Sequence, residues 1–234
     1  MKKVVAFFDF DGTLFQGHFW QGIVKYNITH KKKLASVSTY LGAHIPLWLA
    51  NKFHILSEGA YKVRWGEDVA NLFKKLEKEE GLKVFEWIKS NYFRGLLRSD
   101  IMTILRRHTN EGHTTVLLSG SFNDFLQIVK RDLGIDYAVG TKLEVINNVY
   151  SGRIIKPLCL GINKTKRVKE FISHAKLNID FSSSFAYGDS ILDAPVMEMV
   201  GNPVAVYPDN KLFNLAQQRG WEIIGNPGHS SAHK

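Results

Sequence analysis

The chain has 234 residues, of which 44% are hydrophobic, and it carries a formal net charge of +9. This length is enough for one full hydrophobic core and a small second domain. The single cysteine, Cys159, excludes an internal disulfide bond and is compatible with a reducing compartment. The apolar start is interrupted by two aspartates, and the longest other apolar stretch, near residues 45–50, is too short to span a bilayer. We therefore expect a cytoplasmic protein.

The positive charge favours anionic ligands. The lysines are scattered, however, and no recognised nucleic-acid-binding motif accompanies them. We therefore interpret the charge as mainly solvated surface rather than as an interface for nucleic acid.

Residues 4–13 form an apolar run that ends in two carboxylates, a glycine and a threonine. The run predicts a buried strand, and side-chain alternation places Asp9 and Asp11 on one side of its C-terminal end, where α/β sheets bind ligands. Two buried like charges need a cation or a proton to compensate them, so the pair indicates a metal site, a catalytic acid, or both. The alternative is an Asx turn that only closes the strand.

Residues 15–98 carry no buried-strand pattern and are predicted to form an all-helical insertion. One helical face covers residues 69–76, and we expect Gly81 to end that helix. A second face covers residues 84–92. The aromatic and basic segment from residue 31 to residue 54 is either a buried helix of this insertion or a helix that lies on a membrane surface.

The chain then returns to the sheet through a helix that we expect to begin with Asp100 as N-cap and to stop at Gly112. A second buried strand ends in Ser119, Gly120 and Ser121 before another helix. A serine hydroxyl and an unobstructed glycine N–H at a helix N-terminus form a cradle for an anion, and Ser121 is also expected to be the N-cap. Two strand patterns, over residues 142–146 and 149–155, flank Asn147-Asn148 and predict a β-hairpin.

Lys164 lies at the head of a further predicted helix, where it could neutralise a phosphate and a nucleophile, although a lysine in that place is most often a solvated surface charge. A last strand precedes Gly188 and Asp189, and Asp193 follows one helical turn later. Carboxylates gathered at a strand end suit Mg²⁺, which prefers oxygen ligands. For Asp193 the alternative is a role at a helix N-terminus.

Four motifs in this order resemble the haloacid dehalogenase superfamily, and specifically its phosphoserine-phosphatase-like branch (subfamily IB), which has a helical cap of the C1 type. They are the segment Asp9 to Thr13, Ser119, Lys164, and Gly188-Asp189 with Asp193. The resemblance implies a Rossmann-like, doubly wound, mainly parallel sheet with an inserted helical cap and a small β-hairpin. The core would comprise residues 1–14 and 99–225, the cap residues 15–98, and a disordered tail residues 226–234.

The resemblance also implies a role for each motif. Asp9 would be the nucleophile and Asp11 the acid/base. The phosphate would be bound by Ser119, Gly120 and Lys164, and the Mg²⁺ site would comprise Asp9, Asp11, Asp189 and Asp193. The expected activity is Mg²⁺-dependent hydrolysis of a small-molecule phosphate monoester through an aspartyl-phosphate intermediate.

Several alternatives share parts of this site. A dehalogenase needs no acid at the position of Asp11, which argues against that activity. A phosphomutase would keep the same core residues and protect its intermediate from water. An inactive binding protein on this scaffold is a further alternative. A lipid-phosphate phosphatase that acts at the membrane surface remains an alternative because of the aromatic and basic segment of the cap. Nothing in the sequence indicates an oligomeric state.

One departure from the family concerns the substrate. Phosphoserine phosphatases resembling this chain typically carry a glutamate nine residues after the nucleophile, and their first motif usually has a serine where this chain has Gly12. Here the ninth residue is His18, which offers no negative charge to a substrate ammonium group. We select Gln16, His18 and Arg64 as candidate substrate contacts. Other candidates for lining the cap are Phe19, Trp20, Tyr61, Trp65 and Arg94, although packing within the cap is the alternative role for each aromatic residue.

Overall fold

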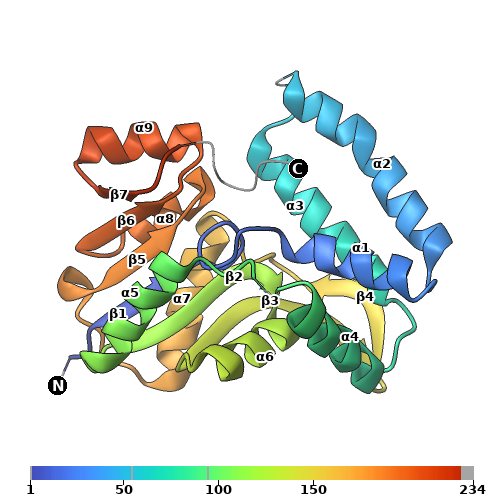
Figure 1. The fold of residues 1–234 in the computed structure, drawn as a ribbon, viewed down its shortest axis with the longest axis horizontal. Coiled ribbons are helices and arrows are strands. Elements are labelled where there is room, and N and C mark those ends of the chain that lie inside the picture. Colours follow the sequence, from blue (N-terminus) through green and yellow to red (C-terminus); the bar gives the residue numbers. More distant parts are fainter. Residues whose placement is uncertain (1, 54, 94, 228–234) are drawn as a thin grey trace.

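In a computed structural model, which describes residues 2–53, 55–93 and 95–227, a mainly parallel sheet forms the centre of the molecule (Figure 1). The strand order is β4-β3-β2-β1-β5-β6-β7, and every neighbouring pair is parallel except β3 and β4. The strands are β1 (Val5–Phe8), β2 (Thr114–Phe122), β3 (Tyr137–Ile146), β4 (Val149–Ile155), β5 (Phe185–Gly188), β6 (Asn202–Val206) and β7 (Glu222–Ile224).

The helices follow the expected succession of an insertion after β1 and then helices that connect parallel strands. The insertion contains α1 (Phe19–Thr29), α2 (Leu34–Lys52), α3 (Glu58–Asp68), the 3₁₀ helix η1 (Val69–Phe73) and α4 (Lys78–Asn91). The remaining helices are α5 (Ser99–Asn110), α6 (Asn123–Leu133), α7 (Ile162–Ala175), η2 (Phe181–Ser183), η3 (Ile191–Asp193), α8 (Ala194–Met197) and α9 (Asn210–Arg219).

The apolar run of β1 explains why the sheet is covered on both faces. Ala6 and Phe8 belong to a core that contains residues of α5 and α6, whereas Val5 and Phe7 belong to a second core with residues of α7, α8 and α9. Alternate residues of a strand point to opposite faces, so an uninterrupted apolar run is buried on both. The predicted doubly wound α/β fold is therefore confirmed.

The helical insertion is joined to the sheet by two segments that lie side by side. The amide of Gln16 donates to the carbonyl of Leu96 (2.8 Å), and the amide of Arg98 donates to the carbonyl of Leu14 (2.9 Å). The predicted cap boundaries fall within these two segments. The cap also shares an aromatic core with the sheet domain, since the ring of Phe19 stacks on that of Phe125 in α6 at 4.3 Å.

Three local predictions were wrong. Gly81 does not end a helix but lies buried inside α4, where a Cβ atom would be 2.3 Å from the ring of Tyr150, so the position requires close packing rather than a turn. Asp100 lies in the first turn of α5, whose N-cap is Arg98. Ser121 is not a helix N-cap, because β2 continues to Phe122 and that residue caps α6.

The predicted hairpin is present, with a longer first strand than expected. The first half of β3 pairs with β2 in parallel and the second half pairs with β4 in antiparallel orientation. Asn147 and Asn148 form the turn with positive φ angles of 49° and 65°, a conformation that asparagine tolerates well. Most of the predicted disordered tail, residues 228–234, lies outside the described residues. Within the part that is described, none of the helices has the length and apolar character needed to cross a membrane.

Candidate active site

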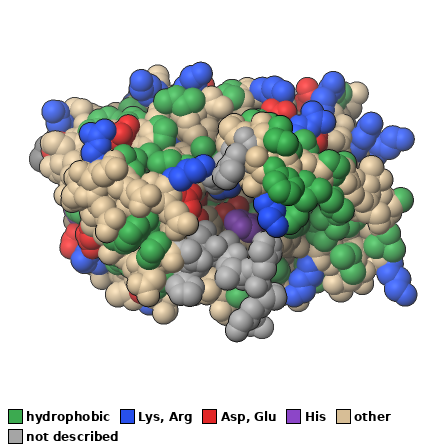
Figure 2. Space-filling view, turned by 90° about the horizontal axis from the view of Figure 1, so that it is seen from above, with side chains coloured by type: hydrophobic (Ala, Val, Ile, Leu, Met, Phe, Trp, Pro, Cys, Tyr) green, Lys and Arg blue, Asp and Glu red, His purple; other side chains and the backbone are tan. Residues whose placement is uncertain are grey.

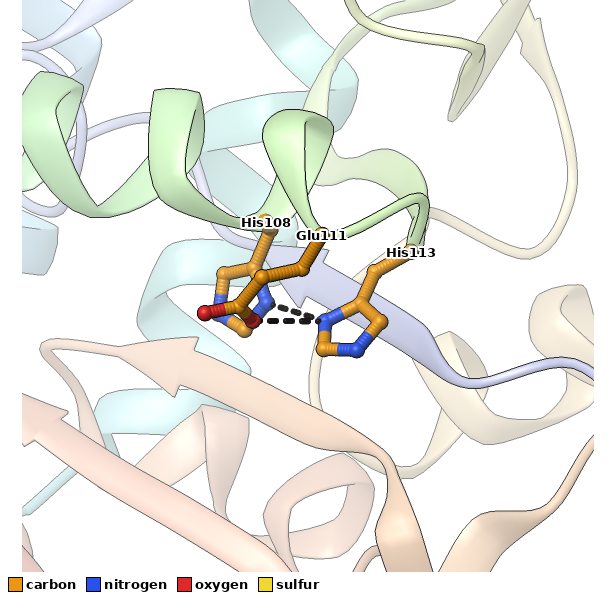
Figure 3. A group of neighbouring side chains, drawn as sticks. All are labelled: His108, Glu111 and His113. Carbon is orange, nitrogen blue, oxygen red and sulfur yellow. Dashed lines mark hydrogen bonds and ion pairs between the residues drawn. The ribbon is translucent and has the colours of Figure 1, made fainter.

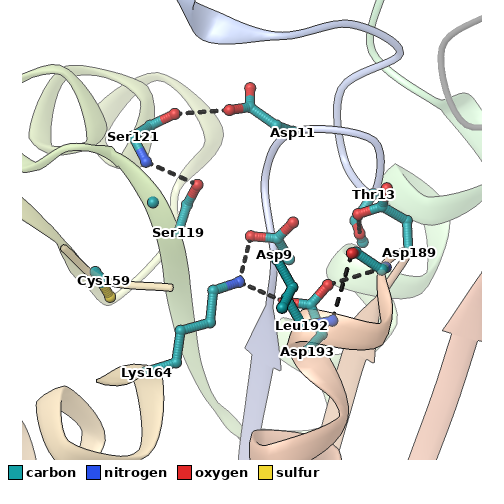
Figure 4. Close-up of polar contacts among 12 residues, drawn as sticks. Asp9, Asp11, Thr13, Ser119, Ser121, Cys159, Lys164, Asp189, Leu192 and Asp193 are labelled. Carbon is teal, nitrogen blue, oxygen red and sulfur yellow. Dashed lines mark hydrogen bonds and ion pairs between the residues drawn. The ribbon is translucent and has the colours of Figure 1, made fainter. Parts of the chain in front are cut away.

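The candidate site lies where the carboxyl ends of β1, β2 and β5 meet (Figure 4). Asp9 follows β1, and its backbone amide donates to the carbonyl of Tyr187 in β5 (2.9 Å). Ser119 lies in the last part of β2, and Asp189 follows β5. Lys164 enters from the first turn of α7. Segments that are far apart in the sequence therefore converge at one edge of the sheet, as the motif order predicts.

Asp9, Lys164 and Asp193 form a buried ion-pair network. The Lys164 ammonium nitrogen is 2.7 Å from Asp9 Oδ1 and 2.5 Å from Asp193 Oδ1, and the lysine is only 2% exposed. Burial alone would lower the pKa of Lys164, but the two carboxylates outweigh this effect and keep the ammonium charged. Burial raises the pKa of Asp9, while Lys164 acts in the opposite direction. Lys164 is thus part of the site and not a solvated surface charge.

Asp189 completes an acidic cluster that suits a divalent cation. Among the described residues, carboxylate oxygens of Asp9, Asp189 and Asp193 lie within 4.8 Å of one another. The Thr13 hydroxyl donates to Asp189 Oδ1 (3.2 Å). Gly12, with a φ of +86°, leaves the space for this carboxylate, because a Cβ atom there would be 2.1 Å from Asp189 Oδ2. Three converging carboxylates form a hard oxygen donor set, which fits Mg²⁺.

Asp11 lies beside this cluster but has different partners. Its Oδ1 accepts a hydrogen bond from the backbone amide of Phe19 (2.9 Å), and its Oδ2 accepts one from the Ser121 hydroxyl (2.9 Å). Burial, and next the neighbouring charge of Asp9, raise the pKa of Asp11 to about 7. The side chain of Asp11 is not in the group of converging carboxylates, so its assignment as a metal ligand stays a prediction.

The residues of the predicted anion cradle lie in the last part of β2, and their role in binding an anion stays a prediction. Ser119 is 1% exposed, and its hydroxyl oxygen accepts a hydrogen bond from the Ser121 amide (3.2 Å). The Gly120 carbonyl accepts a hydrogen bond from the Thr141 hydroxyl (2.7 Å), which holds the last part of β2 against β3. Figure 4 shows Ser119 on the side of the site that also holds Asp9 and Lys164.

The three candidate substrate contacts differ in their positions. His18 is the N-cap of α1 and directly precedes the amide that binds Asp11, whereas the neighbouring Gln16 is exposed. Arg64 lies on α3 with its side chain 64% exposed, and it pairs with Asp68 at 2.7 Å. Arg94 lies outside the described residues.

The aromatic candidates pack mainly against one another. The ring of Trp65 contacts those of Trp20 and Tyr61, with centroids 5.0 and 5.5 Å away, and Phe19 is buried against the aromatic core. Packing against neighbouring rings, within the cap and for Phe19 also with the sheet domain, therefore accounts for these side chains.

Three side-chain contacts at the site were not predicted from the sequence. Ser121 binds Asp11, and its spacing of two from Ser119 along a strand could have indicated that both point the same way. Arg98 is buried and donates from Nε to the carbonyl of Gly12 (3.1 Å). Lys62 reaches from α3 to the hydroxyl of Ser190 (3.2 Å). No sequence signal marks Arg98 or Lys62.

A second group of ligand-type side chains comprises His108 in the last turn of α5, and Glu111 and His113 between α5 and β2 (Figure 3). Nδ1 of His108 is 2.7 Å from Nδ1 of His113, and Nε2 of His108 is 2.8 Å from the Tyr187 hydroxyl. Glu111 is 3.5 Å from His113. Two imidazole nitrogens that share a metal ion would be on the order of 3.3 Å apart, so the shorter distance describes a hydrogen bond between the rings.

Comparisons with known proteins identify the family of the chain. The family model described as haloacid dehalogenase-like hydrolase matches residues 6–198. A putative hydrolase of Mycobacterium leprae is 28% identical over 225 residues, which cover 93% of this chain and 71% of the relative. A phosphoserine phosphatase of Mycobacterium tuberculosis is 28% identical over 229 residues, or 93% of this chain and 69% of that protein.

Solved structures show the same fold. A Bordetella pertussis protein described as having unknown function superposes with a TM-score of 0.82 at 22% identity, covering 96% of this chain and 99% of the other. A phosphoserine phosphatase solved as a phospho-aspartyl intermediate analogue superposes with a TM-score of 0.63 at 18% identity, covering 96% and 93% of the two chains. The predicted fold, enzyme class and family are confirmed: this phosphatase belongs to the haloacid dehalogenase-like hydrolases.

Proposed function

We propose that the protein is a Mg²⁺-dependent phosphomonoesterase that acts on a small-molecule phosphate ester through an aspartyl-phosphate intermediate on Asp9. The observation that carries this proposal is the difference between two neighbouring carboxylates. Asp9 pairs with the Lys164 ammonium and lies among the other acidic side chains, whereas the hydrogen bonds to Asp11 come from two neutral donors, the Phe19 amide and the Ser121 hydroxyl. Carboxylates with such different surroundings suit different roles, one as a nucleophile and one as an acid/base.

In the first step an oxygen of Asp9 attacks phosphorus, and the bond from phosphorus to the ester oxygen breaks. Asp11 gives its proton to the departing alkoxide. In the second step Asp11, now a base, takes a proton from water as that water attacks phosphorus. The bond from phosphorus to Asp9 then breaks, inorganic phosphate leaves and both carboxyl groups return to their starting states.

The remaining residues would hold the phosphoryl group. Lys164, the Ser119 hydroxyl and the amides at Gly120 would bind the equatorial oxygens on which charge develops, and preorganised donors of this kind stabilise the transition state. Mg²⁺ held by Asp9, Asp189 and Asp193 would supply further positive charge against the phosphoryl oxygens. A closed helical cap would exclude water in the first step, and opening of the cap would admit water for the second.

Purified protein assayed with a generic aryl phosphate tests this proposal. We expect hydrolysis that requires Mg²⁺, stops after exhaustive chelation and returns when Mg²⁺ is restored. Activity that survives chelation would contradict the role of the acidic cluster. A phosphomutase would instead transfer the phosphoryl group to a second substrate hydroxyl, so release of inorganic phosphate in a single turnover separates the two activities.

A further inference from the structure

The first two helices of the cap have an unusual charge pattern. No Asp or Glu occurs between Asp11 and Glu58, whereas the same stretch contains five lysines: Lys25, Lys31, Lys32, Lys33 and Lys52. One of them, Lys33, is bound to the carbonyls of Leu72 and Lys74. Lys31, Lys32 and Lys52 are exposed. This segment therefore carries positive charge that no acidic residue of the same segment neutralises.

Helix α2 within this stretch is apolar on two faces. One face, with Val37, Tyr40 and His44, is buried against the rest of the cap. The other face carries Ile45, Trp48 and Leu49, which are 59%, 46% and 40% exposed.

Residues at spacings of three, four and eight share one side of a helix, so the exposed stripe continues to Phe53 (68% exposed), with Ile55 (81%) just beyond. We call Ile45, Trp48, Leu49, Phe53 and Ile55 the α2 face.

The α2 face is a concentrated feature of the surface. Seven of the eleven exposed large hydrophobic residues in the described part of the chain lie between Ile28 and Ile55. Figure 2 shows hydrophobic side chains gathered on the half of the molecule where Figure 1 places α2, with basic side chains near them. The Lys52 ammonium lies over the Trp48 ring at 5.1 Å. An apolar stripe with a tryptophan and an adjacent lysine, on a helix preceded by a run of lysines, has the composition of a helix that lies in the interface of a lipid bilayer.

We propose that the α2 face docks the protein on the surface of an anionic lipid bilayer. The apolar side chains would enter the boundary between headgroups and acyl chains, and the neighbouring lysines would contact anionic headgroups. Charge complementarity favours this partner, because the face combines apolar area with lysines and lacks nearby acidic residues in its own segment. Docking does not depend on the proposed catalytic mechanism, so it can be tested separately.

Sedimentation with lipid vesicles tests the proposal on the full-length protein. We expect the protein to bind vesicles of phosphatidylcholine mixed with phosphatidylglycerol, and to bind vesicles of phosphatidylcholine alone much more weakly. The double variant Ile45→Ser/Phe53→Ser should lower the partition coefficient at least about tenfold, because it removes two insertable side chains and leaves the net charge unchanged.

The matched control is Ile146→Ser/Ile155→Ser on the β-hairpin, whose side chains are 50% and 48% exposed. This control should bind like the wild type, and equal melting temperatures would show that all the variants are folded. Undiminished binding by Ile45→Ser/Phe53→Ser would mean that the net positive charge alone attracts the protein, and would overturn the proposal. Absence of wild-type binding would also overturn it. A third outcome would also overturn the proposal: the wild type is a dimer, Ile45→Ser/Phe53→Ser is a monomer, and neither binds vesicles. In that case a second copy of the chain covers the α2 face.

Discussion

The Ser121 hydroxyl donates a hydrogen bond to Asp11 across 2.9 Å, so the proposed acid/base is held by the strand that also carries the proposed phosphate-binding Ser119. The Ser121 amide donates to the Ser119 hydroxyl at 3.2 Å, which connects the two groups through one residue. Removal of the hydroxyl would leave the Phe19 amide as the remaining hydrogen-bond donor to Asp11 within the described residues. Ser121 is therefore expected to position Asp11 without touching the substrate.

We expect Ser121→Ala to lower kcat about tenfold, with a smaller effect on KM, because a hydrogen bond to a charged group is lost at the acid/base. Steady-state kinetics on an aryl phosphate measure the change. Ser151→Ala is the control, since it removes a hydroxyl bonded to Glu144 on the hairpin. An unchanged kcat in Ser121→Ala would show that the Phe19 amide alone is enough to orient Asp11.

Asp9→Asn is expected to abolish turnover while the protein stays folded, because the change removes the nucleophile and relieves the repulsion between buried carboxylates. Asp11→Asn should lower the rate by at least about 100-fold, since it deletes the acid/base and leaves the nucleophile. Single-turnover kinetics and thermal melts measure both effects. Wild-type rates in Asp9→Asn would refute the covalent mechanism.

Gly12→Ala is expected to reduce activity strongly by displacing the Asp189 carboxylate, which lies where the new Cβ atom would go. Gly112→Ala is a matched control, because Gly112 also has a positive φ (+73°) but has open space around it. Both variants should lose about 1 kcal/mol of stability from backbone strain, and only Gly12→Ala should need a higher Mg²⁺ concentration for half-maximal activity. Equal Mg²⁺ requirements in the two variants would argue against Asp189 as a ligand.

The hydrogen-bonded His108 provides a prediction of pH-dependent stability. Burial, and next the neighbouring His113, lower the pKa of His108 from about 6.5 to about 4. The unfolded chain therefore takes up a proton at a pH where the folded protein does not, and the free energy of unfolding falls as the pH drops from about 6.5 to about 4.

Urea unfolding at several pH values should show a smaller loss over this interval for His108→Gln than for the wild type, even though the variant is less stable at pH 8. The charged or titratable groups near this imidazole are His113, Arg107, Glu111 and Tyr187. Parallel curves for the two proteins would show that other groups dominate the acid sensitivity.

The substrate prediction depends on His18. A substrate ammonium group would have no carboxylate partner at this position, so phosphoserine should have a lower kcat/KM at pH 7 than sugar, glycerol or lipid phosphates without an amine. A panel of these esters measures the difference. His18→Glu should raise the relative activity on phosphoserine, and His30→Glu, on the far end of α1, is the control for added charge. Phosphoserine as the best substrate of the wild type would show that another residue supplies the negative charge.

The fold and the centre of the site were predictable because their signals are local. The strand run before Asp9 is such a signal, and four short motifs in order carried the family resemblance that implied which side chains meet at one edge of the sheet. The contact between Lys62 and Ser190 was not predictable, because it depends on how the cap lies over the core. Gly81 was misread for a related reason: its partner, Tyr150, is far away in the sequence. The exposed side of α2 could not be recognised from its composition, since both of its faces are apolar.

The paired segments at residues 14–16 and 96–98 allow the cap to change in evolution independently of the sheet. The cap leaves and re-enters the core at neighbouring backbone positions, so any insert whose ends lie equally close could replace it without rearranging the sheet. The residues proposed for the chemistry lie outside the insert, whereas the α2 face lies within it. Replacement of the cap could therefore change the location of the enzyme and its substrate, while the chemical reaction stays the same.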